Sequence, residues 1–114
     1  PDLVHLLFGS DTHHHDPLSQ LSITMDCYPA AAQRVRESAD KICGGRVITQ
    51  LAGGYDIPVA ARAFYLVTGV MLDAPTLDIT EPHGEIEDRT EADVTARGDA
   101  VITAVKQKHT SLMT

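Results

Sequence analysis

The stretch that decides the fold covers residues 3–18 and has the sequence LVHLLFGSDTHHHDPL. Its first part, residues 3–8, is short and almost entirely apolar, and a glycine closes it, which predicts a buried β-strand. Asp11 therefore follows the carboxyl end of a strand, and in open parallel α/β sheets this is the edge where ligands bind. Because proline disfavours helical geometry in the residue before it, Asp16-Pro17 predicts a stiff turn behind that carboxylate.

A helix and a second strand follow this loop. Apolar side chains recur at helical spacing between residues 24 and 42, and two glycines then end the pattern. The predicted apolar face consists of Tyr28, Ala31, Ala32, Val35, Ala39 and Ile42, with Thr24 as the N-cap. Residues 46–51 predict the second strand. A strand–helix–strand unit is almost always right-handed with parallel strands, so Asp11 and Tyr55 should lie at the same edge of the sheet.

The rest of the chain predicts two more helices. Asp56 is placed to cap the first, Pro58 suits its first turn, and residues 73–75 stop it. Its predicted apolar face consists of Ala60, Ala61, Phe64, Val67, Val70 and Met71. Residues 75–90 predict a loop, and residues 91–109 a last helix that Gly98 weakens. Two strands would leave both sheet edges open, so we expect the C-terminal part of a larger α/β domain.

Composition limits the possible partners. The net charge of −7 is concentrated between Asp73 and Asp93, where eight acidic residues accompany one basic residue, and this predicts a solvated surface loop rather than a partner site. No basic stripe is present to neutralise phosphates, so we expect no nucleic-acid binding. No apolar run reaches the ~18 residues that a membrane span needs, so we expect no membrane partner.

The two cysteines indicate a reducing environment. Cys27 and Cys43 fall near opposite ends of the first predicted helix, about 24 Å apart at 1.5 Å per residue, which is too far for a disulfide. Free thiols favour a cytoplasmic location.

Two motifs carry a family resemblance. The pattern Gly9-x-Asp11-x-His13-x-x-Asp16-Pro17-Leu18 resembles the late metal-site motif of the zinc-dependent deacetylases, the family of the histone deacetylases and the bacterial acetoin-utilisation-type deacetylases. The triplet Gly53-Gly54-Tyr55 resembles the Gly-rich tyrosine loop of the same family. The two motifs occur in the family's order and spacing, and the likeness runs from residue 2 to residue 74 and again over residues 101–109.

This resemblance implies a fold and a domain organisation. The chain would be a parallel βαβα segment of a three-layer α/β/α arginase/deacetylase-like fold. Residues 1–74 would form the C-terminal part of the catalytic domain, and residues 75–114 an acidic loop and C-terminal helix of the same domain. The family's other zinc ligands, an Asp and a His from an Asp-x-His segment, and its paired-histidine base do not occur here in the right context. We expect them in a missing N-terminal part of the same domain.

The resemblance also assigns roles to individual residues. Asp11 would be a Zn²⁺ ligand, although Asp is also common as a turn or capping residue in such loops. Tyr55 would donate a hydrogen bond to an oxyanion, and the alternative is a buried tyrosine that packs on Pro17. Two preceding glycines let the backbone approach a substrate, so Gly53 and Gly54 are candidate substrate-binding positions.

Pro17 and Leu18 resemble the wall of the family's acyl channel and are further candidate substrate-binding residues, although ordinary turn packing explains them equally well. The three adjacent histidines, His13, His14 and His15, cannot easily point at one ion because neighbouring side chains diverge. We expect them on a solvent-facing loop rim, with His13 at the mouth of the site.

Two functional hypotheses follow. In the first, the chain is the C-terminal portion of a zinc-dependent deacetylase that hydrolyses N-acetyl-lysine or a small acetylated amine to acetate and free amine, and this portion alone is inactive. In the second, the chain is a non-catalytic α/β binding or interaction module that keeps the scaffold without the chemistry.

Overall fold

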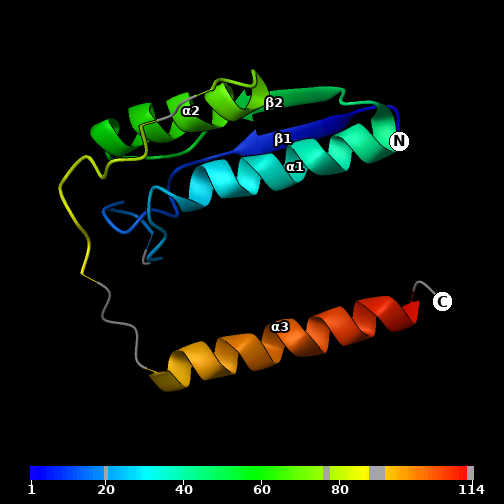
Figure 1. Ribbon diagram of the computed structural model, residues 1–114. Helices are drawn as coiled ribbons and strands as arrows, with labels where there is room; N and C mark the ends of the chain where they lie inside the picture. Colours follow the sequence, from blue (N-terminus) through cyan, green and yellow to red (C-terminus); the bar gives the residue numbers. More distant parts are fainter. Residues whose placement is uncertain (20, 76–77, 88–91, 113–114) are drawn as a thin grey trace.

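The computed structural model describes residues 1–19, 21–75, 78–87 and 92–112. Within these ranges the chain forms β1 (Val4–Phe8), α1 (Cys27–Cys43), β2 (Val47–Leu51), α2 (Ile57–Met71) and α3 (Ala92–Leu112). In the described part, β1 and β2 form a two-stranded parallel sheet, in a register that runs from Val4 opposite Val47 to Phe8 opposite Leu51 (Figure 1). The structure is therefore a small α/β unit, and the predicted parallel strand–helix–strand arrangement is confirmed.

Helices α1 and α2 pack together on one face of this sheet. Alternate residues of β1 point toward them, so Leu6 and Phe8 are partly buried against the core. The ring of Phe8 meets Tyr28 of α1 and Phe64 of α2 edge-on, with centroid distances of 5.4 Å and 5.9 Å. The buried core consists of Met25, Tyr28, Ala32, Val59, Ala63, Leu66, Val67 and Val70.

The opposite face of the sheet is uncovered in the part of the chain that the structure describes. Leu7 and Ile48 are large, apolar and exposed there. His5 and Gln50 lie on the same face and are joined by a side-chain hydrogen bond of 3.2 Å. Parallel sheets are normally covered by helices on both faces, so an exposed apolar face of this kind is unusual.

Helix α1 begins three residues after the predicted N-cap. Thr24 does not cap it; its hydroxyl donates to Asp26, which occupies the N-cap position without a side-chain capping bond. Among the predicted apolar positions Tyr28, Ala32 and Ala39 are buried.

Two positions of that predicted face are wrong, because Ala31 and Ile42 are exposed and the buried stripe continues to Cys43 instead. Gly44, with φ 64°, ends the helix in the left-handed conformation. Both cysteines are free, as predicted.

Helix α2 begins as predicted, since Asp56 accepts a 3.1 Å hydrogen bond from the N–H of Val59. Its predicted apolar face is mostly confirmed, since Ala60, Val67 and Val70 are buried and only Ala61 is exposed. The prediction missed Val59, Ala63 and Leu66, which are also buried. Arg36 of α1 fastens the far end of α2, donating to the carbonyl of Val70 at 2.9 Å and to Asp73 at 2.8 Å. The carbonyl of Val70 also accepts from the N–H of Asp73 at 3.2 Å, so Arg36 adds a second partner at this helix end.

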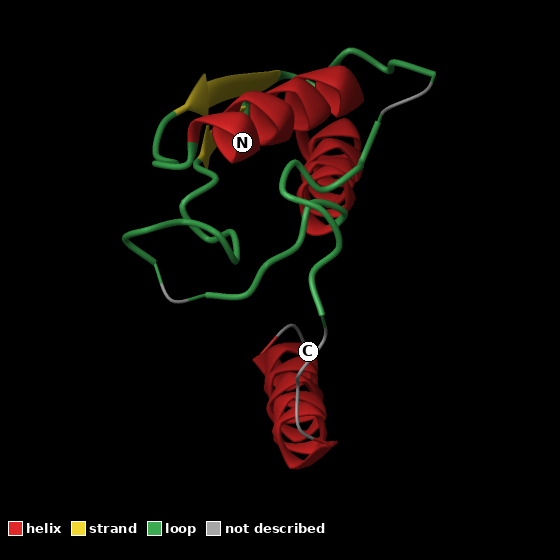
Figure 2. Ribbon diagram, turned by 90° about the vertical axis from the view of Figure 1, so that its left-hand side faces the viewer, coloured by secondary structure: helices red, strands yellow, loops and turns green. Residues whose placement is uncertain are grey.

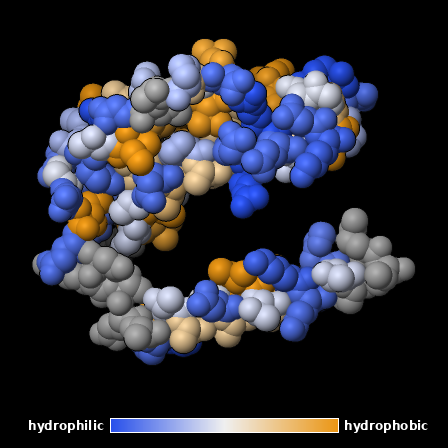
Figure 3. Space-filling view, in the orientation of Figure 1, coloured by the Kyte–Doolittle hydropathy of each residue, from blue (hydrophilic) through white to orange (hydrophobic). Residues whose placement is uncertain are grey.

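Helix α3 confirms the predicted last helix, although Glu91, where we expected it to begin, lies outside the described residues. Figures 1 and 2 both place α3 apart from the rest of the chain. Its residues 93–110 are exposed along their whole length. They include Val101, Ile102 and Val105, and Figure 3 shows apolar atoms at the middle of α3 in open space.

Across the described ranges, no helix combines the length and the apolar character that crossing a membrane requires. The cytoplasmic location expected from the free cysteines stays a prediction.

Candidate functional site

Two loops meet at the carboxyl edge of the sheet. Residues 9–23 leave β1 and residues 52–56 leave β2, and backbone hydrogen bonds join them. The N–H of Ala52 donates to the carbonyl of Phe8 at 2.7 Å, and the N–H of Ser10 donates to the carbonyl of Gly53 at 3.4 Å. The predicted meeting of the Asp11 loop and the Tyr55 loop at one edge is therefore confirmed.

The carboxylate of Asp11 lies directly against Gly53. A Cβ at Gly53 would come within 2.9 Å of Asp11 Oδ2, and the φ of 79° at Gly53 already disfavours any other residue. Gly54 has φ 111°, and a Cβ there would collide with the hydroxyl of Ser10. Both glycines are thus required for the close approach of the two loops, which is the local reason for the Gly-Gly pair.

Asp11 keeps its carboxylate available. The side chain is partly buried, and within the described ranges no hydrogen bond or ion pair engages its carboxylate oxygens. A carboxylate in this situation offers oxygen ligands to a cation. It stands alone, however, because the described residues contain no group of three or more His, Cys, Asp or Glu side chains placed to hold a metal ion. Among the described residues Asp11 therefore offers one oxygen donor rather than a complete metal site.

Tyr55 is presented to solvent rather than buried. Its side chain is 55% exposed, so the alternative of a buried tyrosine packing on Pro17 is wrong. No hydrogen bond to its hydroxyl is found among the described residues. Its backbone N–H, by contrast, donates to Oδ2 of Asp16 at 2.9 Å. The tyrosine is therefore anchored at its backbone and free at its hydroxyl.

Asp16 joins the two loops through its side chain, a role that the sequence did not reveal. Only 5% of its surface is exposed, and its Oδ1 accepts hydrogen bonds from the N–H groups of Leu18 at 2.9 Å and Ser19 at 3.1 Å. Burial by itself would raise the pKa of the Asp16 carboxyl, but the N–H groups of Tyr55, Leu18 and Ser19 outweigh it and lower that pKa. Asp16 is thus held as a carboxylate.

Part of this arrangement carries a sequence signal. An Asp that accepts N–H bonds from two and three residues onward is a common turn, and Asp16 lies in such a turn before Pro17. Its bond to Tyr55, 39 residues along the chain, has no such local signal.

Pro17 and Leu18 are exposed on the same loop, Leu18 by 70%. In the described part of the chain, neither takes part in the hydrogen bonds between the two loops, which involve Asp16 and Ser10.

His13 corrects the prediction of a solvent-facing rim, because it is fully buried. Its Nδ1 accepts from the N–H of His15 at 3.2 Å, so Nε2 carries the proton and donates to Glu81 at 3.0 Å. Its ring also stacks on Tyr28, with centroids 6.2 Å apart. His14 and His15 are exposed, as predicted.

Segment 78–87 contacts this edge through hydrogen bonds and ion pairs, so it is more than the solvated loop that we predicted. Glu81 also accepts from the N–H of Met25 at 2.6 Å, so it bonds both to His13 in the loop after β1 and to the backbone just before α1. His83 bonds to Asp56 at 2.9 Å, and this hydrogen bond lowers the pKa of the Asp56 carboxyl. Asp78 pairs with Arg62. Two acidic residues of this segment, Asp78 and Glu81, therefore have specific partners on the folded unit.

Comparison with known proteins places this geometry in a family. The family model described as the histone deacetylase domain matches residues 1–71. The chain belongs to the histone deacetylase family. It is 40% identical over 77 residues to histone deacetylase 10, chloroplastic, of Oryza sativa subsp. japonica, covering 68% of this chain and 17% of that protein. It is 39% identical over 57 residues to acetoin utilization protein AcuC of Bacillus subtilis, covering 50% of this chain and 15% of that protein.

A third relative extends the match to almost the whole chain. Histone deacetylase 8 of Arabidopsis thaliana is 30% identical over 113 residues, which cover 99% of this chain and 29% of that protein. The chain thus spans less than a third of the length of each of these relatives. The matched residues 1–71 include both loops of the candidate site.

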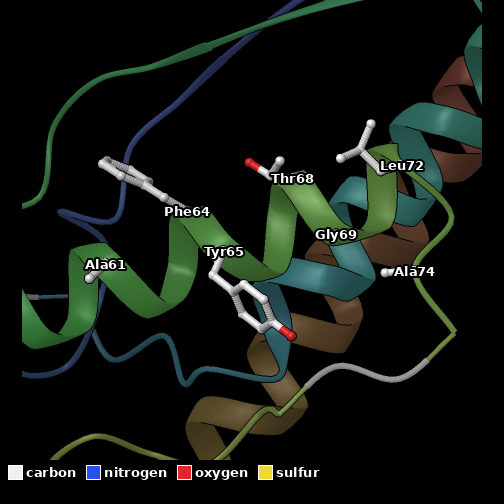
Figure 4. A pocket seen from close by; sticks show the side chains of 7 residues that line it. All are labelled: Ala61, Phe64, Tyr65, Thr68, Gly69, Leu72 and Ala74. Carbon is white, nitrogen blue, oxygen red and sulfur yellow. The ribbon is translucent and has the colours of Figure 1, made fainter.

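An apolar groove lies elsewhere on the unit. It has a volume of about 480 Å³ and is lined by side chains of α2 and the residues after it, including Phe64, Tyr65 and Leu72 (Figure 4). None of the predicted site residues lines it. The groove is therefore a surface feature of α2 and not the candidate site.

Proposed function

We propose that this chain forms the C-terminal part of the catalytic domain of a zinc-dependent deacetylase, which hydrolyses N-acetyl-lysine or a related acetylated amine to acetate and free amine. The observation that carries the proposal is the meeting of Asp11 and the Tyr55 loop at one sheet edge, within the residues that match the family. The resemblance of both loops to the family's motifs supports the same conclusion.

Asp11 would supply one zinc ligand, since its carboxylate is free of protein partners in the described part of the chain. The remaining ligands and the paired-histidine base would come from a part of the domain outside this sequence. A bound Zn²⁺ supplies Lewis-acid polarisation of the acetyl carbonyl and lowers the pKa of a water.

Tyr55 would donate its hydroxyl proton as a hydrogen bond to the carbonyl oxygen as negative charge develops there. Its ring is exposed and its hydroxyl has no partner among the described residues, which suits that task because a hydroxyl already bonded within the protein would be less available. The two glycines before it let the substrate pass close to the backbone. Exposed Pro17 and Leu18 would line the acyl channel on the facing loop.

The uncovered surfaces support the three-layer fold. The face of the sheet that carries Leu7 and Ile48 would be covered by a further helical layer, and the groove on α2 by neighbouring parts of the same domain. Residues 1–74 and 75–114 would both belong to that domain. Contacts of Glu81 and Asp78 with the unit favour this assignment for the second segment.

The test is acetate release from an acetyl-lysine peptide by the protein that contains this chain. Activity should disappear when a chelator removes the metal and return when zinc is restored. The variant Asp26→Asn, whose exposed carboxylate accepts from Thr24, should behave as the parent does. Persistent activity in metal-free protein would contradict zinc dependence, and no activity with zinc present would contradict the deacetylase proposal.

A second candidate is a non-catalytic binding or interaction module. The observation that favours it is the lone Asp11, since the described residues hold no complete metal site. In that case the protein that contains this chain would lack a His-His pair and an Asp-x-His segment before residue 1. Sequencing upstream of Pro1 decides between the two.

A further inference from the structure

We propose that Asp16 is a positioning residue, whose buried carboxylate fixes the backbone of Tyr55 and thereby aims the tyrosine hydroxyl at the Asp11 edge of the site. This inference rests on the proposed function, because Tyr55 needs aiming only if its hydroxyl takes part in the reaction.

The two oxygens of Asp16 serve different loops. Oδ1 accepts from Leu18 and Ser19 at 2.9 Å and 3.1 Å, which ties the carboxylate to its own turn. Oδ2 accepts from the N–H of Tyr55 at 2.9 Å, which ties the same group to the loop after β2. The backbone N–H of Asp16 donates to the carbonyl of His13 at 3.0 Å. The carboxylate is therefore itself held in place before it holds Tyr55.

The Tyr55 loop requires such an anchor. Two glycines with positive φ precede Tyr55, and glycine has more backbone freedom to lose than any other residue. Asp56, directly after Tyr55, starts α2 and fixes the following side. The side chain of Tyr55 is mostly solvent-exposed, so packing contributes little to its placement. The hydrogen bond from its own N–H is thus the nearest restraint on the direction of the ring.

Only a carboxylate satisfies this arrangement. An ionised Asp accepts hydrogen bonds at both oxygens, whereas Asn has one acceptor oxygen and one NH₂ donor. In Asp16→Asn the single oxygen can serve Leu18 and Ser19 or Tyr55, and the NH₂ group then faces an N–H group of the other loop. The variant keeps the size of the side chain and breaks the connection between the loops.

The experiment is a double-mutant cycle in the protein that contains this chain, with an acetyl-lysine peptide as substrate. Asp16→Asn should lower kcat by about 10²-fold, the order of loss expected for a slightly misplaced catalytic group, with little change in KM or zinc content. Tyr55→Phe already lacks the hydroxyl, so Asp16→Asn with Tyr55→Phe should be no slower than Tyr55→Phe alone. Asp26→Asn is the control.

If the decreases in kcat of the two single variants multiply in the double variant, the proposal is overturned, because Asp16 would then act independently of Tyr55. Full kcat in Asp16→Asn would overturn it as well. If circular dichroism shows that Asp16→Asn does not fold, the same cycle with Asp16→Glu decides, since Glu keeps the charge and displaces it by one methylene.

A readout without activity separates this inference from the proposed function. Hydrogen exchange at the Tyr55 amide should be faster in Asp16→Asn than in the parent, and an unchanged rate would overturn the positioning role. If the parent releases no acetate with zinc present, the proposed function fails, and the exchange rate alone then decides whether Asp16 fixes Tyr55.

Discussion

The carboxyl edge of the sheet and the outer surfaces of the same unit differ in whether their side chains have partners within the structure. At the edge, Asp16, His13 and Glu81 bond to backbone and side-chain groups from three separate segments. On the outer surfaces, Leu7 of β1 and Leu72 after α2 are large apolar side chains exposed to solvent. The difference teaches that the hydrogen bonds supporting the site lie within the described residues, whereas those same residues leave the outer apolar surfaces uncovered.

The largest expected effect contrasts a leucine on the buried face of α2 with the leucine directly after its last residue. Leu66 is fully buried and Leu72 is 76% exposed. Leu66→Ala should cost about 2–5 kcal/mol of unfolding free energy, enough to unfold a chain this small, whereas Leu72→Ala should stay within about 0.5 kcal/mol. Urea unfolding of the 114-residue chain measures both, and equal costs would mean that Leu72 is packed against the rest of the chain.

The next effect tests the contact between the loops through two glycines with positive φ. A Cβ at Gly54 collides with Ser10, whereas a Cβ at Gly84 meets nothing within 4 Å. Gly54→Ala should therefore lower kcat on the order of 10²-fold by moving Tyr55, and Gly84→Ala should not. Steady-state kinetics of both variants in the protein that contains this chain gives the comparison. Equal rates would show that the collision has no consequence for the site.

A smaller effect concerns acid stability. The hydrogen bonds to Asp16 hold its pKa below the ordinary value, so its contribution to stability is complete above the unfolded pKa of about 3.9 and is lost as pH falls through the folded pKa. Asp16→Asn should have a lower free energy of unfolding than the parent at neutral pH. The difference between the two free energies should become smaller below about pH 4. Urea unfolding of both proteins at several pH values measures this difference, and a difference independent of pH would contradict the low pKa assigned to Asp16.

The smallest effect lies in α3, which stands apart. Gly98 is in mid-helix and a Cβ there meets nothing within 4 Å. Gly98→Ala should stabilise α3 by about 1 kcal/mol and raise the helical signal in circular dichroism. The near-ultraviolet circular dichroism of the core, where Tyr28 is buried, should disappear at the same urea concentration as in the parent. A shifted midpoint for Tyr28 would show that α3 supports the core.

The sequence predicted what depends on local pattern. The apolar run of β1, the spacing in α1 and the Asp56 cap of α2 are short-range features, and the parallel sheet follows from their order. It missed the burial of His13, whose partner Glu81 is 68 residues away in a segment that composition alone describes as acidic. The link from Asp16 to Tyr55 was missed for the same reason, since both partners look like ordinary turn residues.

The faces of the two core helices were predicted less well than their positions. In α2 most residues are apolar, so periodicity could not say which side meets the sheet, and Ala61 was assigned to the wrong face. The proposed roles of Asp11 and Tyr55 rest on the resemblance of their loops to the family's motifs, because the described residues hold no complete metal site around them.

The most direct test of the central claim measures zinc stoichiometry together with kcat for Asp11→Ala and Tyr55→Phe in the protein that contains this chain. Asp11→Ala should lose zinc and activity together, because it removes a charged ligand. Tyr55→Phe should keep its zinc and its fold and lose on the order of 10²–10³ in kcat. Stoichiometric zinc and full activity in Asp11→Ala would make that residue an ordinary turn aspartate, and full kcat in Tyr55→Phe would deny the tyrosine a catalytic role.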